Sequence, residues 1–290
     1  MKRLAILWLA FTAAATAAER PAPPAGLTVD GAGGGTACPK HVVVTGYWPP
    51  TNEMLRPWST DPAQNPDGWQ GRDWRGLGFD VYAYFPEFPP DGVPFNDPRG
   101  SAGFIGSAES DFRVDYQDTS ADFWRIMTDR RPLILITTSR GGDIGWEVEA
   151  FEGGHGSGDG DPAEDWISDD HPPETLPVRD SIDPRSWDAI SRFRAGERLA
   201  SRLPTAEIAV AARMLDLTDV AIDEQTSGNY LSGFMGLHGL YYALTHEETV
   251  AAGHIHVGRD VPAGDARRLM EVTLETVLGR YDPDALGCSD

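Results

Sequence analysis

Short apolar runs and longer amphipathic stretches alternate along the chain from about residue 40 onward. Runs such as residues 41–46 and 133–137 are apolar nearly throughout and border Gly or polar residues, which is typical of buried parallel strands. Residues 205–215 instead repeat apolar positions at helical spacing. Strands are expected near residues 41–46, 79–85, 133–137, 220–222 and 252–257, and helices over 119–129, 192–203, 205–215, 230–244 and 265–278. The alternation predicts an α/β fold, namely a three-layer α/β/α sandwich with a mostly parallel central sheet.

Two segments interrupt this alternation and are expected to be insertions in one α/β domain spanning residues 38–290. Residues 86–113 are rich in Pro, Gly and Asp, and residues 153–185 are rich in Gly, Asp and Pro. The second begins Asp159-Gly-Asp161 like a calcium loop, but Ala163 occupies the next ligand position and disfavours calcium there.

The first residues have the pattern of a secretory signal. Lys2 and Arg3 precede an apolar run over residues 4–14, and small residues follow at 15–18. We therefore expect a signal peptide over residues 1–18, a flexible Pro-, Gly- and Ala-rich leader over 19–37, and export to the periplasm or outside the cell. The apolar run is short for a bilayer, so no stable membrane insertion is expected after cleavage, although an uncleaved anchor is the alternative.

Charge and cysteine content narrow the possible partners. The formal net charge is −21, which disfavours nucleic-acid binding and favours a soluble or salt-adapted surface over an acidic docking surface. The two cysteines, Cys38 and Cys288, lie at opposite ends of the domain. In an oxidising compartment they could form a disulfide, and two free thiols are the alternative.

Three residues are candidates for the chemistry of acyl transfer. Ser232 stands where a Gly-containing turn enters a predicted helix, and backbone N–H groups there favour developing negative charge. His256 ends a predicted strand, where open α/β sheets place their sites. With Glu147 to orient the imidazole, these residues could supply a nucleophile, its base and the partner of the base.

Each of these residues also has an ordinary structural interpretation. A Ser at a helix start is often only a cap, and Glu147 by itself fits a solvated surface position. His254 and His256 share a strand face and suggest a metal pair, but no third ligand is apparent. Spacing alone therefore does not decide whether these three residues form a catalytic triad.

Four segments, taken in order, resemble the pyroglutamyl peptidase I (pyrrolidone-carboxylate peptidase) family. Thr45-Gly-Tyr-Trp-Pro-Pro50 is similar to the family's Thr-Gly-Phe-x-Pro-Phe motif, with Pro57 matching the Pro that follows it. Residues 143–150 resemble the stretch around the family's catalytic Glu, which falls on Glu147. Residues 226–232 resemble the Ala-Gly-aromatic-aliphatic-Cys signature, and the catalytic His falls on His256.

The resemblance implies a Cys-His-Glu peptidase without metal or cofactor, which removes an N-terminal pyroglutamyl residue. Carried over by position, Ser232 takes the place of the nucleophile, His256 that of the base and Glu147 that of its carboxylate partner. The implied partner is a peptide with a blocked N-terminus, and the oligomeric state is not indicated. The implied substrate-binding positions are Tyr47, Pro50, Thr137, Tyr230 and Leu231.

The departures from the family pattern bear on activity. Ser232 replaces a thiol of pKa about 8.5, and its hydroxyl needs concerted proton removal by a base. Pro50 replaces an aromatic residue, residues 137–141 replace a Gln-Ala-Gly-Gly-Arg stretch, and Glu152 stands at an Asn position. The family's oxyanion-site arginine has no clear counterpart, and Trp166 is a candidate for its place.

Three hypotheses follow. The first is an exported serine-dependent hydrolase of pyroglutamyl or related amide bonds. The second is a catalytically inactive homologue that binds a peptide end or another partner. The third and weakest is an exported metal-dependent hydrolase using His254, His256 and nearby carboxylates.

Overall fold

The computed structural model describes residues 40–88, 106–107, 109–153, 198–225, 228 and 230–286. These residues belong to a unit that spans Gly35–Asp290. The predicted signal peptide and leader, both cysteines and Trp166 lie outside the described residues, as does nearly all of the segment 153–185.

A six-stranded sheet forms the centre of this unit, with the strand order β2-β1-β3-β8-β4-β7. Neighbouring strands run parallel except β4 and β8, which pair antiparallel. The strands are β1 (His41–Thr45), β2 (Asp80–Tyr84), β3 (Ile134–Gly141), β4 (Trp146–Glu149), β7 (Val220–Asp223) and β8 (Ala251–Gly258). A separate two-stranded sheet joins β5 (Phe151–Gly153) to β6 (Arg198–Ala200).

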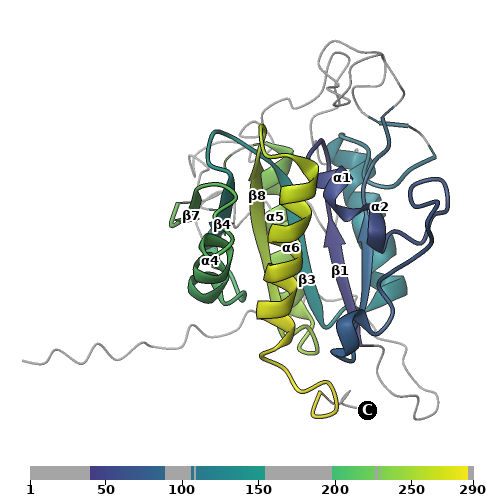
Figure 1. Ribbon diagram of the computed structural model, residues 1–290. Coiled ribbons are helices and arrows are strands. Elements are labelled where there is room, and N and C mark those ends of the chain that lie inside the picture. Colours follow the sequence, from purple (N-terminus) through teal and green to yellow (C-terminus); the bar gives the residue numbers. More distant parts are fainter. Residues whose placement is uncertain are drawn as a thin grey trace, which may run out of the picture. The chain divides into compact units, whose positions relative to one another are not determined.

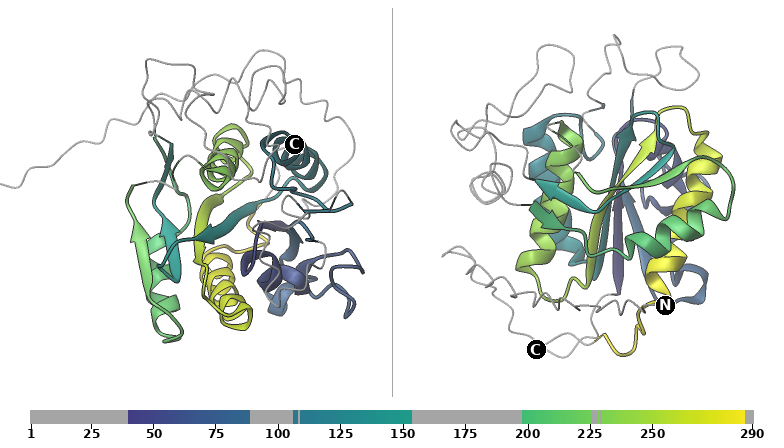
Figure 2. Two further views of the ribbon diagram at one scale, coloured as in Figure 1. Left: turned by 90° about the horizontal axis from the view of Figure 1, so that it is seen from above. Right: turned by 90° about the vertical axis from the view of Figure 1, so that its left-hand side faces the viewer.

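Helices cover both faces of the six-stranded sheet (Figures 1 and 2). On one face the core contains residues of α1 (Thr51–Leu55), α4 (Thr205–Arg213) and α6 (Ala263–Leu278). On the other it contains residues of α2 (Tyr116–Arg130) and α5 (Leu231–Thr245). The short 3₁₀ helices η1 (Arg56–Trp58) and η2 (Trp74–Gly76) connect β1 to β2. The predicted α/β/α sandwich with a mostly parallel sheet is confirmed.

Two glycines of α5 face side chains of neighbouring strands, one on β5 of the two-stranded sheet and one on β3 of the central sheet. A Cβ on Gly236 would lie 2.5 Å from the Glu152 carboxyl, and a Cβ on Gly239 would lie 3.3 Å from Thr137. Glu152 itself is buried. Glycine at these positions therefore lets α5 lie close to β5 and to β3, the second of which carries polar residues described below.

Two secondary-structure predictions require correction. The predicted helix over residues 192–203 is wrong where it is described, because residues 198–200 form β6 and residues 201–203 are not helical. Strand β4 was not predicted at all, since alternating polar residues break its apolar run. Its alternation is nevertheless that of a strand with Trp146 and Val148 in the core and two glutamates on the opposite face.

Among the described residues, no helix combines the length and the apolar character needed to cross a membrane.

Candidate active site

Polar side chains from three adjacent strands meet around His256 on β8. Ser139 on β3 is its register partner on one side, and Glu147 on β4 is its register partner on the other. Register partners project from the same face of a sheet. The strand pairing therefore gathers a hydroxyl, an imidazole and carboxylates on the face that α5 covers.

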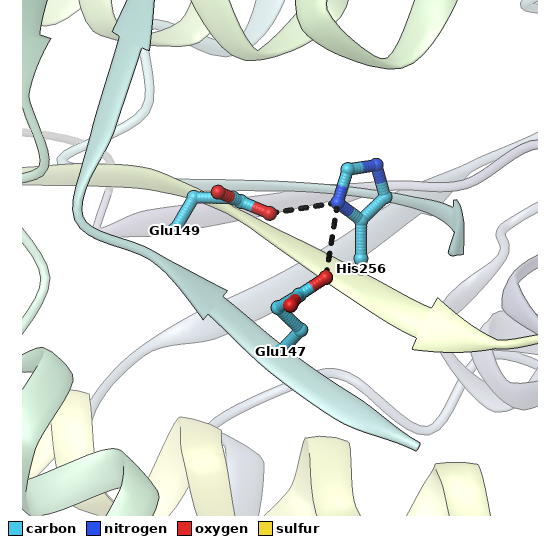
Figure 3. A group of neighbouring side chains, drawn as sticks. All are labelled: Glu147, Glu149 and His256. Atoms are coloured by element: carbon cyan, nitrogen blue, oxygen red, sulfur yellow. Dashed lines mark hydrogen bonds and ion pairs between the residues drawn. The ribbon is translucent and has the colours of Figure 1, made fainter. Parts of the chain in front are cut away.

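The carboxylate that holds His256 is Glu149, two residues beyond the predicted Glu147. Glu149 Oε1 lies 2.7 Å from His256 Nδ1, whereas Glu147 Oε2 lies 3.9 Å from the same nitrogen. Figure 3 shows both carboxylates reaching the Nδ1 side of the ring, with the other ring nitrogen directed away from them. Only Glu149 is within hydrogen-bond distance of His256, whereas Glu147, the predicted carboxylate partner, lies at ion-pair distance.

Burial controls the electrostatics of this group. Burial raises the pKa of Glu149 above its usual range, although the hydrogen bond from His256 opposes the shift. Burial likewise raises the pKa of Glu147, where the His256 imidazole opposes the shift and the nearby Asp223 carboxylate adds to it. The second oxygen of Glu149, Oε2, is buried without a hydrogen-bond partner among the described residues. Ionised carboxylates here are therefore poorly solvated and favour a proton donor such as the imidazole.

A pocket of about 510 Å³ opens beside His256 and includes Ser232 in its wall. Three of the predicted substrate-binding residues, Tyr47, Tyr230 and Leu231, also line it. The lining residues are Tyr47, Trp48, Val114, Ser139, Arg140, Gly141, Gly142, Glu147, Asp223, Tyr230, Leu231, Ser232, His256 and Arg259.

Pro50 and Thr137, the other two predicted substrate-binding residues, do not line this pocket. Pro50 is the residue immediately before α1, and its carbonyl accepts a hydrogen bond from the Met54 N–H. Thr137 is fully buried within the sheet and contacts His254. The substrate-binding role that the resemblance implies for Pro50 and Thr137 therefore stays a prediction, without support from this pocket.

Ser232 is the second residue of α5, and the turn before the helix positions it. Gly228 in that turn has φ +86°, and its carbonyl lies so near Gly233 that a Cβ there would be 2.2 Å away. The turn and the helix thus meet at positions that require glycine. The first N–H groups of a helix lack intrahelical partners, so this end of α5 is suited to stabilising negative charge beside Ser232.

His254 lies two residues before His256 and has a different environment. It is fully buried, with Thr137 Oγ1 2.8 Å from Nδ1 and Ser139 Oγ 2.9 Å from Nε2. Burial holds the pKa of His254 well below its usual value, with a smaller contribution from His256. Both ring nitrogens of His254 are therefore engaged, and a metal site would instead draw on Glu147, Glu149 and His256, whose candidate ligand atoms lie within 4.8 Å of one another.

The sequence predictions omitted several residues of the site. Arg140 and Arg259 line the pocket, with the Arg140 guanidinium 5.0 Å from the ring centre of Trp48. Arg259 Nη2 lies 3.3 Å from the exposed carboxylate of Asp143. Arg140 lies near the end of β3 and Arg259 comes directly after β8, at the sheet edge where α/β proteins place their sites, and that position is the sequence signal that could have identified them.

Gly141 is a further omitted residue, at the end of β3. A Cβ at this position would lie 2.8 Å from the Cβ of His256. At neighbouring Gly142, a Cβ would meet nothing within 4 Å. Gly141 therefore makes room for the imidazole in its observed place.

Comparisons with known proteins identify relatives by fold. No protein-family model matches the chain, and no curated protein matches it by sequence. The pyrrolidone carboxyl peptidase of Thermococcus litoralis superposes with a TM-score of 0.54 at 15% identity, covering 87% of this chain and 99% of that chain. A mutant pyrrolidone carboxyl peptidase of Pyrococcus furiosus gives a TM-score of 0.53 at 15% identity, covering 83% and 99%. At this identity the likeness establishes a shared fold.

Proposed function

We propose that this protein is an exported serine-dependent hydrolase that removes N-terminal pyroglutamyl or related residues from peptides. The observation that carries the proposal is the 2.7 Å contact between Glu149 Oε1 and His256 Nδ1, in a protein where His256 and Ser232 line the same pocket. A buried carboxylate that accepts the Nδ1 proton keeps Nε2 free to act as a base.

In the proposed reaction, Ser232 Oγ attacks the carbonyl carbon of the pyroglutamyl residue while His256 Nε2 takes the hydroxyl proton. The negative charge of Glu149 stabilises the resulting imidazolium. N–H groups in the first turn of α5 stabilise the oxyanion, and the imidazolium returns the proton to the leaving amine as the C–N bond breaks. Water then repeats the sequence on the acyl-enzyme, which releases pyroglutamate and restores the Ser232 hydroxyl.

The proposed substrate class rests on three supports. The fold is shared with structures described as pyrrolidone carboxyl peptidases. The sequence motifs around residues 45–50 and 226–232 resemble that family. The pocket combines aromatic walls from Tyr47 and Tyr230 with polar groups, as expected for a small ring that carries an amide. Export is proposed from the N-terminal signal pattern alone.

The direct experiment assays the purified mature protein on a pyroglutamyl chromogenic amide. Turnover should fall by at least about 10³-fold in Ser232→Ala, because the nucleophile is lost. Ser201→Ala is the matched control, since Ser201 does not line the pocket and its hydroxyl accepts a hydrogen bond from the Leu203 N–H. Full activity in Ser232→Ala would reject Ser232 as the nucleophile. Saturable binding of a pyroglutamyl peptide without any turnover would support an inactive binding protein instead.

A metal-dependent hydrolase is the second candidate, favoured by the grouping of Glu147, Glu149 and His256. Two carboxylates and an imidazole are suitable ligands for a divalent transition metal. Stoichiometric metal in the purified protein, together with activity lost to a chelator and restored by the metal, would favour this candidate over the serine mechanism.

A further inference from the structure

A chain of hydrogen bonds leads from the interior of the sheet to the pocket through His254. Thr137 Oγ1 donates to the carbonyl oxygen of Gly253 at 3.3 Å and lies 2.8 Å from His254 Nδ1. His254 Nε2 lies 2.9 Å from Ser139 Oγ, and Ser139 lines the pocket. The proposed reaction uses none of these groups.

The direction of each hydrogen bond in this chain follows from counting protons. Thr137 Oγ1 lies 3.3 Å from the Gly253 carbonyl, which can only accept, and a hydroxyl that donates its one proton there accepts from His254 Nδ1–H. A neutral imidazole carries one N–H, so Nε2 of His254 is an acceptor. Ser139 therefore donates its only proton to His254, and its remaining lone pairs can only accept.

We propose that Ser139 is a specificity-determining residue, a hydroxyl fixed as a hydrogen-bond acceptor for a neutral N–H of the substrate. This inference rests on the proposed function and refines it: the N–H is that of the lactam ring of a pyroglutamyl residue or of a related cyclic amide. Ser139 is the β3 register partner of His256, so the accepting oxygen lies on the strand beside the proposed base.

The burial of Ser139 favours a neutral donor over an ammonium group. Ser139 is only 4% exposed, and His254 beneath it is fully buried. A free N-terminal ammonium at this oxygen would lose much of its hydration and gain a hydrogen bond to a hydroxyl that carries no charge. A lactam N–H carries no charge and has a much smaller desolvation cost. The arrangement thus favours a cyclised N-terminus over a free one.

The first test reads the proton positions without any substrate. Long-range ¹H–¹⁵N correlation spectra of the histidine-labelled full chain should show His254 as the neutral Nδ1–H tautomer, with His254→Gln used to assign its signals. An Nε2–H tautomer would make Ser139 a donor toward the pocket and would overturn the assignment, whatever the substrate is.

The second test measures ligand selection in the Ser232→Ala protein, which leaves the ligand intact. Calorimetry compares pyroglutamyl-alanine with its 3-oxocyclopentanecarbonyl isostere, in which CH₂ replaces the ring N–H. The N–H ligand should bind about tenfold more tightly, and adding Ser139→Ala should bring this ratio close to one. A ratio unchanged by Ser139→Ala would overturn the inference. Failure of both ligands to bind Ser232→Ala would reject the proposed substrate class. The ¹H–¹⁵N spectrum of His254 would then by itself show whether Ser139 donates its proton to His254.

Discussion

The two faces of the central strands β3 and β8 are both buried, yet they have opposite chemistry. The face that belongs to the core with α6 carries Ile134, Ile136, Ile255 and Val257. The face covered by α5 carries Thr137, Ser139, His254 and His256 along the same strands. Burying apolar groups stabilises a fold, whereas burying polar groups costs free energy unless each finds a partner. The polar face is therefore the part of the sheet that stability alone does not explain.

Within the polar face, the two histidines of β8 show how partners define roles. His254 contacts two hydroxyls and is fully buried, so it remains neutral and acts within the hydrogen-bond network. His256 contacts a carboxylate and lines the pocket, so its protonated form can be stabilised when a proton arrives. His254 and His256 are only two residues apart, yet the first is a structural histidine and the second is a candidate base.

The largest effect in this comparison is expected from removing the charge that supports His256. Glu149→Gln should lower kcat on the pyroglutamyl amide by about 10³- to 10⁴-fold, because the imidazolium loses its buried counter-charge and its fixed tautomer. Glu147→Gln is the matched control and should cost less than about tenfold, since that carboxylate is 3.9 Å from the ring nitrogen. Steady-state kinetics on both variants would settle the order, and a greater loss in Glu147→Gln would identify Glu147 as the catalytic partner of His256.

A smaller effect is expected from displacing His256 without changing its chemistry. Gly141→Ala places a methyl group 2.8 Å from the Cβ of His256, so the imidazole must shift. A displacement of about 1 Å can cost about 10²-fold in rate, so kcat should fall by that order while far-UV circular dichroism stays unchanged. Gly142→Ala is the neighbouring control with open space around its Cβ. Equal losses in the two variants would show that His256 is not held by this contact.

The smallest effect concerns the pH dependence of stability. Because burial lowers the pKa of His254 well below its ordinary value of 6.5, the unfolded chain binds more protons than the folded protein at acidic pH. The contribution of His254 to the free energy of unfolding is complete above pH 6.5 and is lost as the pH falls, by at most about 1.4 kcal/mol per pH unit. Glu149 acts in the opposite sense, because its raised pKa makes the folded state the stronger proton acceptor.

Denaturant unfolding measured between about pH 7.5 and 5 should separate these contributions. His254→Gln should show a shallower loss of stability with acidification than the unaltered protein, since both retain Glu149. Parallel curves would contradict the burial of a neutral histidine on the polar face.

Sequence patterns predict those helices and strands whose hydrophobic pattern is contained within the element itself. Continuous apolar runs identified the central strands, and helical periodicity identified α2, α4, α5 and α6. Strand β4 was missed because its inward positions alternate with Glu147 and Glu149. Strand β6 was mistaken for part of a helix, since its strand character depends on pairing with β5, a contact that no local pattern records.

The same distinction separates what could be predicted about the site from what could not. Ser232 and His256 were chosen as candidates from motifs, and the pocket contains both. Which glutamate contacts His256 depends on how β4 crosses β8, and Glu147 and Glu149 share one strand face. Sequence spacing therefore could not distinguish a register partner from a hydrogen-bonding partner. The arginines Arg140 and Arg259 similarly reach one pocket through the sheet topology rather than through proximity in the chain.

Covalent trapping is the sharpest test of whether Ser232 is a nucleophile activated by His256. The mature protein would be treated with a fluorophosphonate, which reacts with activated serine hydroxyls, and the adduct located by intact-mass and peptide-mapping mass spectrometry. We expect a single adduct on Ser232 that disappears in His256→Ala. An adduct on Ser139 instead, or labelling of Ser232 that persists at the same rate without His256, would contradict this expectation.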